Sequence, residues 1–141
     1  MVTYLLDTNV VSEARKTRGD ANVKAWLAPK HDSQLFLSSL VLGEIRIGIE
    51  RLRRHDHRQA DLLELWLVNL RPQYADRILP VTVDVADEWA RMSVPDPVPI
   101  IDGLIAATAK VHDLILVTRD TGYFAERGVR VLNPFESPNS I

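Results

Sequence analysis

The stretch VTYLLDTN at residues 2–9 joins a run of apolar and β-branched residues to a cluster of turn-forming and cap-forming residues. Its first part predicts a short buried strand over residues 2–6, because such runs are typical of parallel sheets. Asp7 follows directly, so its carboxylate is expected at the carboxyl end of that strand. Open α/β sheets bind their ligands at the carboxyl ends of their strands. A ligand site near Asp7 is therefore expected.

Outward from this stretch, strand-like and helix-like segments alternate along the chain. We expect further strands at residues 35–37, 78–83, 114–118 and 129–132, and helices at 20–27, 40–52, 58–71, 84–92 and 99–109. Pro72 is expected to end the third helix, since proline disrupts a helix interior. That helix should bury one apolar face, made of Leu62, Leu65, Trp66, Leu67 and Leu70. The alternation predicts an α/β fold with a mainly parallel sheet and helices on both faces.

Composition excludes several classes of protein. The chain has 141 residues, 46% of them hydrophobic and 26% charged, which predicts one globular domain over residues 1–141. It has no cysteine, so disulfides and thiolate metal sites are excluded, and any metal must bind to oxygen or imidazole. The longest run without an ionisable residue is Ser33–Gly43, which is too short to span a membrane. Because residues 1–7 lack the basic region and apolar run of a secretory signal, a cytoplasmic location is expected.

Four carboxylates are expected to converge at one end of this fold. Asp7 and Asp120 each follow a predicted strand, Asp102 lies in the first turn of a predicted helix, and Glu44 interrupts an apolar helix. Two like charges about 4 Å apart repel by around 4 kcal/mol at an effective dielectric near 20. A cluster of this kind, expected to be largely buried, must take up protons or a hard divalent cation such as Mg2+ or Mn2+. Such ions activate water for attack on a phosphodiester.

Each acid also has a purely structural explanation. Asp7 could cap a helix, Asp120 could occupy a turn, and Asp102 could interact with a helix dipole. Glu44 could lie on a solvated helix face. The hypothesis of a metal site therefore depends on all four residues together.

Four sequence motifs carry a family resemblance. They are LLDTNVVSE at residues 5–13, LGEI at 42–45, IDGLIAATA at 101–109 and VTRDT at 117–121. Together they resemble the PIN domain, and most closely the VapC-type toxins of bacterial toxin-antitoxin pairs in the FitB-like branch. The resemblance implies a three-layer α/β/α domain with a central, mainly parallel twisted sheet. It also implies a metal-dependent endoribonuclease toxin of a type II toxin-antitoxin system.

The same resemblance implies roles for particular residues. Asp7, Glu44, Asp102 and Asp120 match the acidic quartet that binds Mg2+ or Mn2+ and catalyses hydrolysis by a metal-activated water, while Asn9 and Thr118 match supporting polar positions. The implied partners are an RNA substrate, a second copy in a homodimer, and a VapB-type antitoxin in a hetero-oligomer. The segment 93–99 departs from the family pattern, because it is short and rich in proline.

A basic run follows Glu44 and leaves two explanations open. Arg46, Arg51, Arg53, Arg54 and Arg58 could complement a helix end or contact RNA or antitoxin. A haloacid dehalogenase-type phosphatase would need a second aspartate where Asn9 stands, which argues against that class. A catalytically silent RNA-binding or protein-binding module on the same fold remains the alternative to a nuclease.

Overall fold

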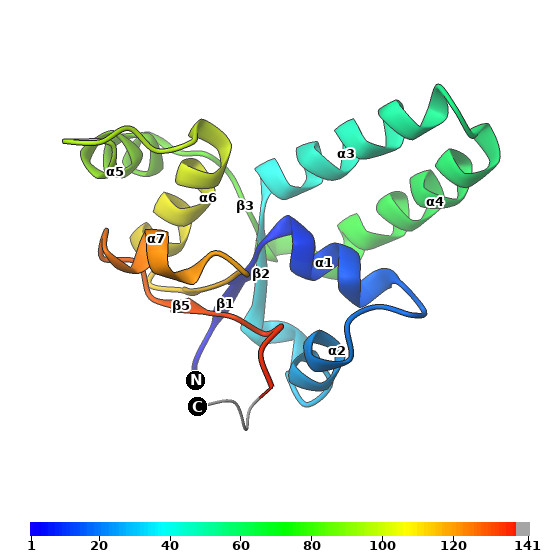
Figure 1. The fold of residues 1–141 in the computed structure, drawn as a ribbon, viewed down its shortest axis with the longest axis horizontal. Helices are drawn as coiled ribbons and strands as arrows, with labels where there is room; N and C mark the ends of the chain where they lie inside the picture. Colours follow the sequence, from blue (N-terminus) through cyan, green and yellow to red (C-terminus); the bar gives the residue numbers. More distant parts are fainter. Residues whose placement is uncertain (138–141) are drawn as a thin grey trace.

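A computed structural model describes residues 1–137 and shows a sheet in which all neighbouring strands are parallel (Figure 1). Its strands are β1 (Tyr4–Leu6), β2 (Leu35–Ser38), β3 (Ile78–Leu79), β4 (Ile115–Val117) and β5 (Val131–Leu132). Their order across the sheet is β3-β2-β1-β4-β5. The predicted α/β fold with a parallel sheet is confirmed.

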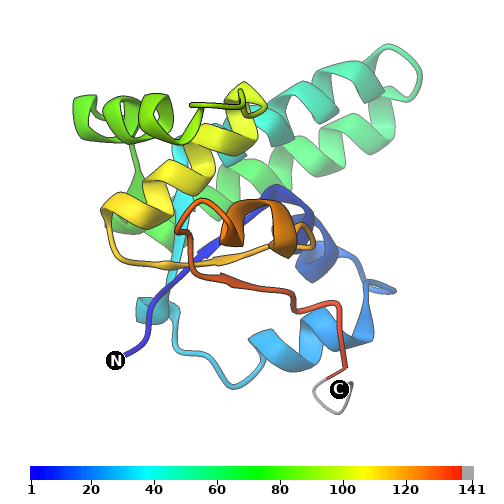
Figure 2. The same ribbon diagram turned by 60° about the vertical axis from the view of Figure 1, so that its left-hand side comes forward.

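The helices form a layer on each face of this sheet. They are α1 (Thr8–Arg15), α2 (Ala21–Leu27), α3 (Ser39–Arg53), α4 (His57–Tyr74), α5 (Val83–Met92), α6 (Ile100–Val111) and α7 (Thr121–Ala125). Two 3-10 turns, Asp32–Gln34 and Ala75–Arg77, precede β2 and β3. Figure 1 shows α1 to α4 on one side of the sheet and α5 to α7 on the other, and Figure 2 gives the same arrangement from a second direction. The predicted three-layer architecture is confirmed.

The strand order explains both the two helical layers and the position of a crevice. From β1 the chain moves outward through β2 to β3, then crosses to β4 and moves outward in the opposite direction to β5. Right-handed crossovers place helices on opposite faces when the direction reverses. The central strands β1 and β4 are adjacent, with Leu6 opposite Val117. Ligands bind beyond the carboxyl ends of strands at such a switch point.

The core consists of the sheet and the helix faces that pack on it. Leu5, Leu37 and Val117 are fully buried, and Ala106 and Ala107 of α6 are equally inaccessible. The small alanine side chains allow α6 to lie close to its neighbours, and its most extensive contact is with α5. Among residues 1–137, no helix is both long enough and apolar enough to cross a membrane.

The structure corrects three predictions about these elements. Helix α4 continues through Pro72 to Tyr74: the proline removes one N–H hydrogen bond of the last turn, and the helix ends two residues later rather than at the proline. The strand predicted at 78–83 is only Ile78–Leu79, and Val83 begins α5. Leu62 and Leu65 do not face the core: they are 58% and 61% exposed. Of the predicted face of α4, only Leu67 and Leu70 are buried, while Trp66 is half-buried.

Candidate active site

A pocket of about 500 Å³ opens beyond the carboxyl ends of β1 and β4. It is lined by Asp7, Thr8, Asn9, Glu44, Asp102, Thr118, Arg119, Asp120 and Phe124. The structure therefore brings the four predicted acids and the two predicted supporting residues to the same pocket. They come from the N-cap and first turn of α1, from α3 and α6, and from the connection after β4, so only the fold places them together.

Asp7 is held by hydrogen bonds to both carboxylate oxygens. The backbone N–H of Thr8 donates to Oδ1 over 2.8 Å, which makes Asp7 the N-cap of α1. The hydroxyl of Thr118 donates to Oδ2 over 2.9 Å. Capping and pocket lining are therefore compatible at this residue, since one carboxylate does both.

Thr118 links the two acids that follow the central strands. Its side chain is 2% exposed, and its Oγ1 also accepts a hydrogen bond from the backbone N–H of Asp120 over 3.2 Å. A buried hydroxyl with both donor and acceptor partners has one preferred orientation. Thr118 thus sets the position of the Asp7 carboxylate relative to the start of the Asp120 turn.

Glu44 reaches the pocket from α3 and is held by Thr8. The Thr8 hydroxyl donates to Glu44 Oε1 over 2.5 Å. The pKa of Glu44 is raised, chiefly by partial burial and further by the charges of Asp7 and Asp102, although the bond from Thr8 opposes this. Sequence reasoning did not single out Thr8, whose only signal was its place between Asp7 and Asn9.

Asp102 lies at the start of α6, on the other side of the pocket. The pKa of Asp102 is also raised, first by partial desolvation and then by the charges of Asp7 and Asp120. Both Asp102 and Asp120 are nonetheless exposed, and Asp7 and Glu44 are only half-buried. The expectation of a buried cluster is therefore wrong. The acids surround an open pocket, in which water lowers the cost of their mutual repulsion.

The pocket's donor set suits a hard divalent cation. Every acid is an oxygen ligand, as are the hydroxyls of Thr8 and Thr118 and the amide of Asn9. Within residues 1–137, however, no three Asp, Glu or His side chains are placed so that they could already hold an ion. An ion would have to draw these side chains inward by changes of rotamer.

The proline-rich connection before Asp102 is tied to the helix after Asp120. Arg127 donates from Nε to the carbonyl of Met92 over 3.3 Å and from a terminal nitrogen to the carbonyl of Tyr123 over 2.9 Å. The Tyr123 hydroxyl donates to the carbonyl of Pro97 over 3.3 Å. The bond from Tyr123 joins the connection 93–99, which leads into α6, to α7, and the bond from Arg127 to Met92 joins the end of α5 to the residues that follow α7. The segments that carry Asp102 and Asp120 are therefore held together by contacts outside the pocket.

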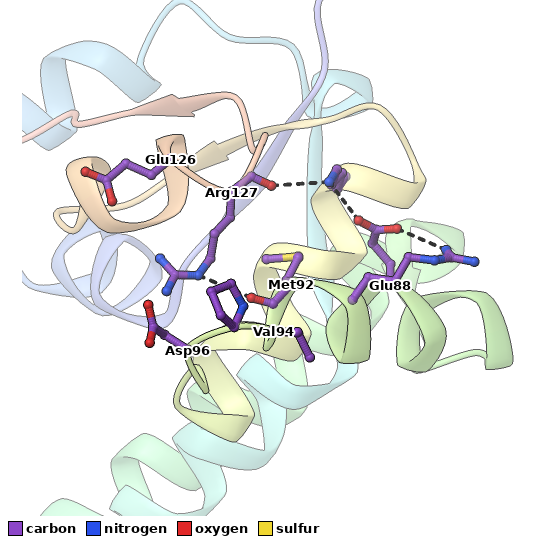
Figure 3. A pocket seen from close by; sticks show the side chains of 9 residues that line it. Glu88, Met92, Val94, Asp96, Glu126 and Arg127 are labelled. Carbon is purple, nitrogen blue, oxygen red and sulfur yellow. Dashed lines mark hydrogen bonds and ion pairs between the residues drawn. The ribbon is translucent and has the colours of Figure 1, made fainter.

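Figure 3 shows a second hollow, of about 480 Å³, beside these contacts. Its charged groups mostly satisfy one another: Lys110 pairs with Glu88 at 2.7 Å, and Arg91 pairs with Glu88 at 3.4 Å. Lys110 also donates to the carbonyl of Arg127 over 3.2 Å. The charged side chains around this hollow therefore join α5, α6 and the end of α7.

None of the five predicted basic contacts lines the acidic pocket. Arg46 donates to both oxygens of Glu64, at 2.5 and 2.6 Å, and Arg53 bonds to Asp61 at 2.7 Å and Glu64 at 3.2 Å. These two residues join α3 to α4. Arg51, Arg54 and Arg58 are exposed and form no ion pair within the described part of the chain.

Comparisons with known proteins agree with this geometry. The family model described as PIN domain matches residues 4–129. The chain is 36% identical over 136 residues to Toxin FitB of Neisseria gonorrhoeae, covering 93% of this chain and 97% of that protein. It is 32% identical over 137 residues to VapC ribonuclease Y4jK of Sinorhizobium fredii, covering 94% and 97%. The crystal structure of FitAcB from Neisseria gonorrhoeae superposes with a TM-score of 0.87 at 35% identity, covering 96% of this chain and 100% of that one.

Proposed function

Because this chain belongs to the PIN domain family, we propose that it is an endoribonuclease toxin of a type II toxin-antitoxin system. Residues 1–141 would form a single nuclease domain acting on RNA in the cytoplasm. The observation that carries the proposal is the convergence of Asp7, Glu44, Asp102 and Asp120 on one pocket at the switch point of the sheet. VapC ribonuclease Y4jK, which the chain resembles along almost its whole length, supports the reaction class.

The four acids would hold Mg2+ or Mn2+ in this pocket. Such an ion, when bound, lowers the pKa of a water molecule and stabilises negative charge on phosphorus oxygens. The chain contributes the orientation of its ligands: Thr118 and Thr8 donate to Asp7 and Glu44 and restrict their rotation. The raised pKa values of Glu44 and Asp102 also favour a bound cation. Both carboxylates are repelled by neighbouring carboxylates, and a cation would offset that repulsion.

The proposed partners are a VapB-type antitoxin and a second copy of the chain. Solved structures similar to this chain include FitAcB and FitAB bound to IR36 DNA fragment, the latter with a TM-score of 0.86 at 33% identity. An open pocket lined by four carboxylates suits a basic antitoxin side chain, which would compete with the cation. Leu62, Leu65 and Val68 of α4 are between 58% and 61% exposed and offer apolar surface for a homodimer or hetero-oligomer.

A catalytically silent RNA-binding or protein-binding module is the second candidate. The observation that favours it is the separation of the carboxylates. Within residues 1–137, no three of them lie close enough together to hold a metal ion without rearrangement. The two candidates differ in whether the pocket closes on an added ion and the RNA is then cut.

Cleavage of total cellular RNA by the purified chain tests the proposal. We expect cleavage with Mg2+ or Mn2+, none with EDTA, and a large loss in Asp7→Asn. The matched control is Asp113→Asn, which removes an acid that is 93% exposed and pairs with Arg130 away from the pocket. Cleavage that persists in EDTA, or that is as fast in Asp7→Asn as in the parent, rules out the metal mechanism.

A further inference from the structure

Among the residues of the described part, 1–137, that line the acidic pocket, Arg119 is the single basic one. It stands between Thr118, which holds Asp7, and Asp120, which is itself one of the four acids. We propose that Arg119 binds a backbone phosphate of single-stranded RNA at the rim of this pocket. This inference rests on the proposed nuclease function and adds a substrate-binding residue to it.

The Arg119 side chain is exposed, yet its position is defined by stacking. Its guanidinium carbon lies 3.9 Å from the centre of the Phe135 ring. A guanidinium that stacks through its face keeps its N–H edges available for oxygen acceptors. Arginine held in this way is suited to phosphate, which it can bind through two parallel hydrogen bonds.

The stacking ring is itself held by two hydrogen bonds to its backbone. The N–H of Phe135 donates to Asn133 Oδ1 over 2.9 Å, and Asn22 Nδ2 donates to the carbonyl of Phe135 over 2.8 Å. Asn133 also donates to the carbonyl of Arg119 over 3.4 Å. The segment after β5 and the helix α2 therefore support the guanidinium from behind. Such support lowers the entropy lost when the side chain binds a ligand.

Arg119 is not committed to the neighbouring acids. Within residues 1–137 its side chain forms no ion pair with Asp7, Asp120 or any other carboxylate. Glu13 is close enough to feel its charge, but Glu13 already accepts from Lys16 at 3.2 Å and from the backbone N–H of Asp20 at 2.9 Å. The guanidinium is therefore free for an incoming anion.

A phosphodiester approaching this pocket needs such a cation. Four carboxylates repel the RNA backbone, and a bound ion would offset only part of their charge at the reacting phosphate. The five arginines of the basic run cannot serve this purpose at the pocket, because none of them lines it. Arg119 thus supplies the fixed positive charge beside the acids.

The test measures RNA binding against salt concentration. The chain carries Asp7→Asn to prevent cleavage, and a short fluorescent single-stranded oligoribonucleotide is titrated in Mg2+ at several salt concentrations. Arg119→Ala should weaken binding about tenfold or more at low salt. It should also reduce the slope of log affinity against log salt by about 0.7, the value for one phosphate contact in a single strand. Arg119→Lys should retain the slope but bind more weakly than the arginine, because it loses the bidentate geometry.

Arg130→Ala is the matched control. Arg130 is an exposed arginine that pairs with Asp113 at the start of β5, at the opposite edge of the sheet from the pocket. Equal slopes and affinities for Arg119→Ala and Arg130→Ala overturn the inference. It is also overturned if the chain with Arg119 intact shows no salt-dependent RNA binding, or if Arg119→Ala weakens only binding of the antitoxin. Failure of the nuclease proposal is seen separately, as absence of cleavage by the parent chain.

Discussion

Gly103 lies next to Asp102 and allows α6 to approach α5. A Cβ atom at this position would lie 2.5 Å from Val98 Cγ2 and 2.9 Å from Trp89 Cδ1. Real Cβ atoms do not come this close to their neighbours, and Val98 is only 6% exposed, so it cannot simply turn away into solvent. In Gly103→Ala the two helices must therefore separate. The carboxylate of Asp102, one residue away, must move with them.

The expected stability loss follows from two opposing contributions. Overpacking of a well-packed site costs about 1–3 kcal/mol, and replacing glycine by alanine within a helix regains about 1 kcal/mol. The contacts from two different side chains place Gly103→Ala in the upper part of the first range. We expect a net loss of about 1–2 kcal/mol, which lowers the melting temperature by roughly 3–8 °C for a domain of this size.

Thermal unfolding followed by circular dichroism measures this loss, with Gly48→Ala as the control. Gly48 lies within α3, and a Cβ there would meet nothing within 4 Å. Gly48→Ala should therefore stabilise the chain by up to about 1 kcal/mol through helix propensity alone. The reasoning is refuted if Gly103→Ala melts at or above the parent, or if both variants shift in the same direction. RNA cleavage should fall in Gly103→Ala alone, because only that change displaces an acid of the pocket.

Three further predictions test the electrostatics and the supports of the pocket. Asp102→Asn should raise the melting temperature in EDTA at neutral pH, because the raised pKa means that the charged carboxylate destabilises the fold; the gain should shrink as the pH falls through that pKa, and a gain independent of pH would contradict this cause. Adding Mg2+ or Mn2+ should raise the melting temperature of the parent more than that of Asp102→Asn, and equal shifts in differential scanning fluorimetry would argue against a shared ion. Thr118→Val, which keeps the buried shape but removes the donor to Asp7, should cost about 2 kcal/mol in chemical denaturation and reduce cleavage, whereas Thr17→Val at an exposed position should do neither.

Much of the fold was predictable because its signals are local. The run before Asp7 forms β1, and the apolar run before Thr118 forms β4, each as a buried strand followed by polar residues. Asp20 and Ser38 cap α2 and α3 through their side-chain oxygens, which is also a local interaction. The candidate acids could be identified for the same reason, since each occupies a strand end or a helix position that the sequence pattern marks.

Other features were not predictable because they depend on contacts between distant elements. The spacing of Leu62 and Leu65 indicates an apolar helix face, but periodicity does not say whether another element covers that face, and here none does within the described chain. The basic run looks uniform in sequence, yet Arg46 and Arg53 meet Glu64 of the next helix. Glu64 lies 18 positions from Arg46 and 11 from Arg53, so these pairs depend on the packing of α3 against α4.

The sequence by itself determined most of the strands and helices, the parallel α/β class and the four candidate acids, because hydrophobic periodicity, capping residues and strand ends are local properties of a chain. Only the tertiary structure decided how those acids are used. The reversal of strand order between β1 and β4 brings Asp7 and Asp120 to one pocket, and Thr8 and Thr118 hold two of the carboxylates there. The physical reason is that charge interactions and buried hydrogen bonds depend on distance in space, which separation along the chain does not set.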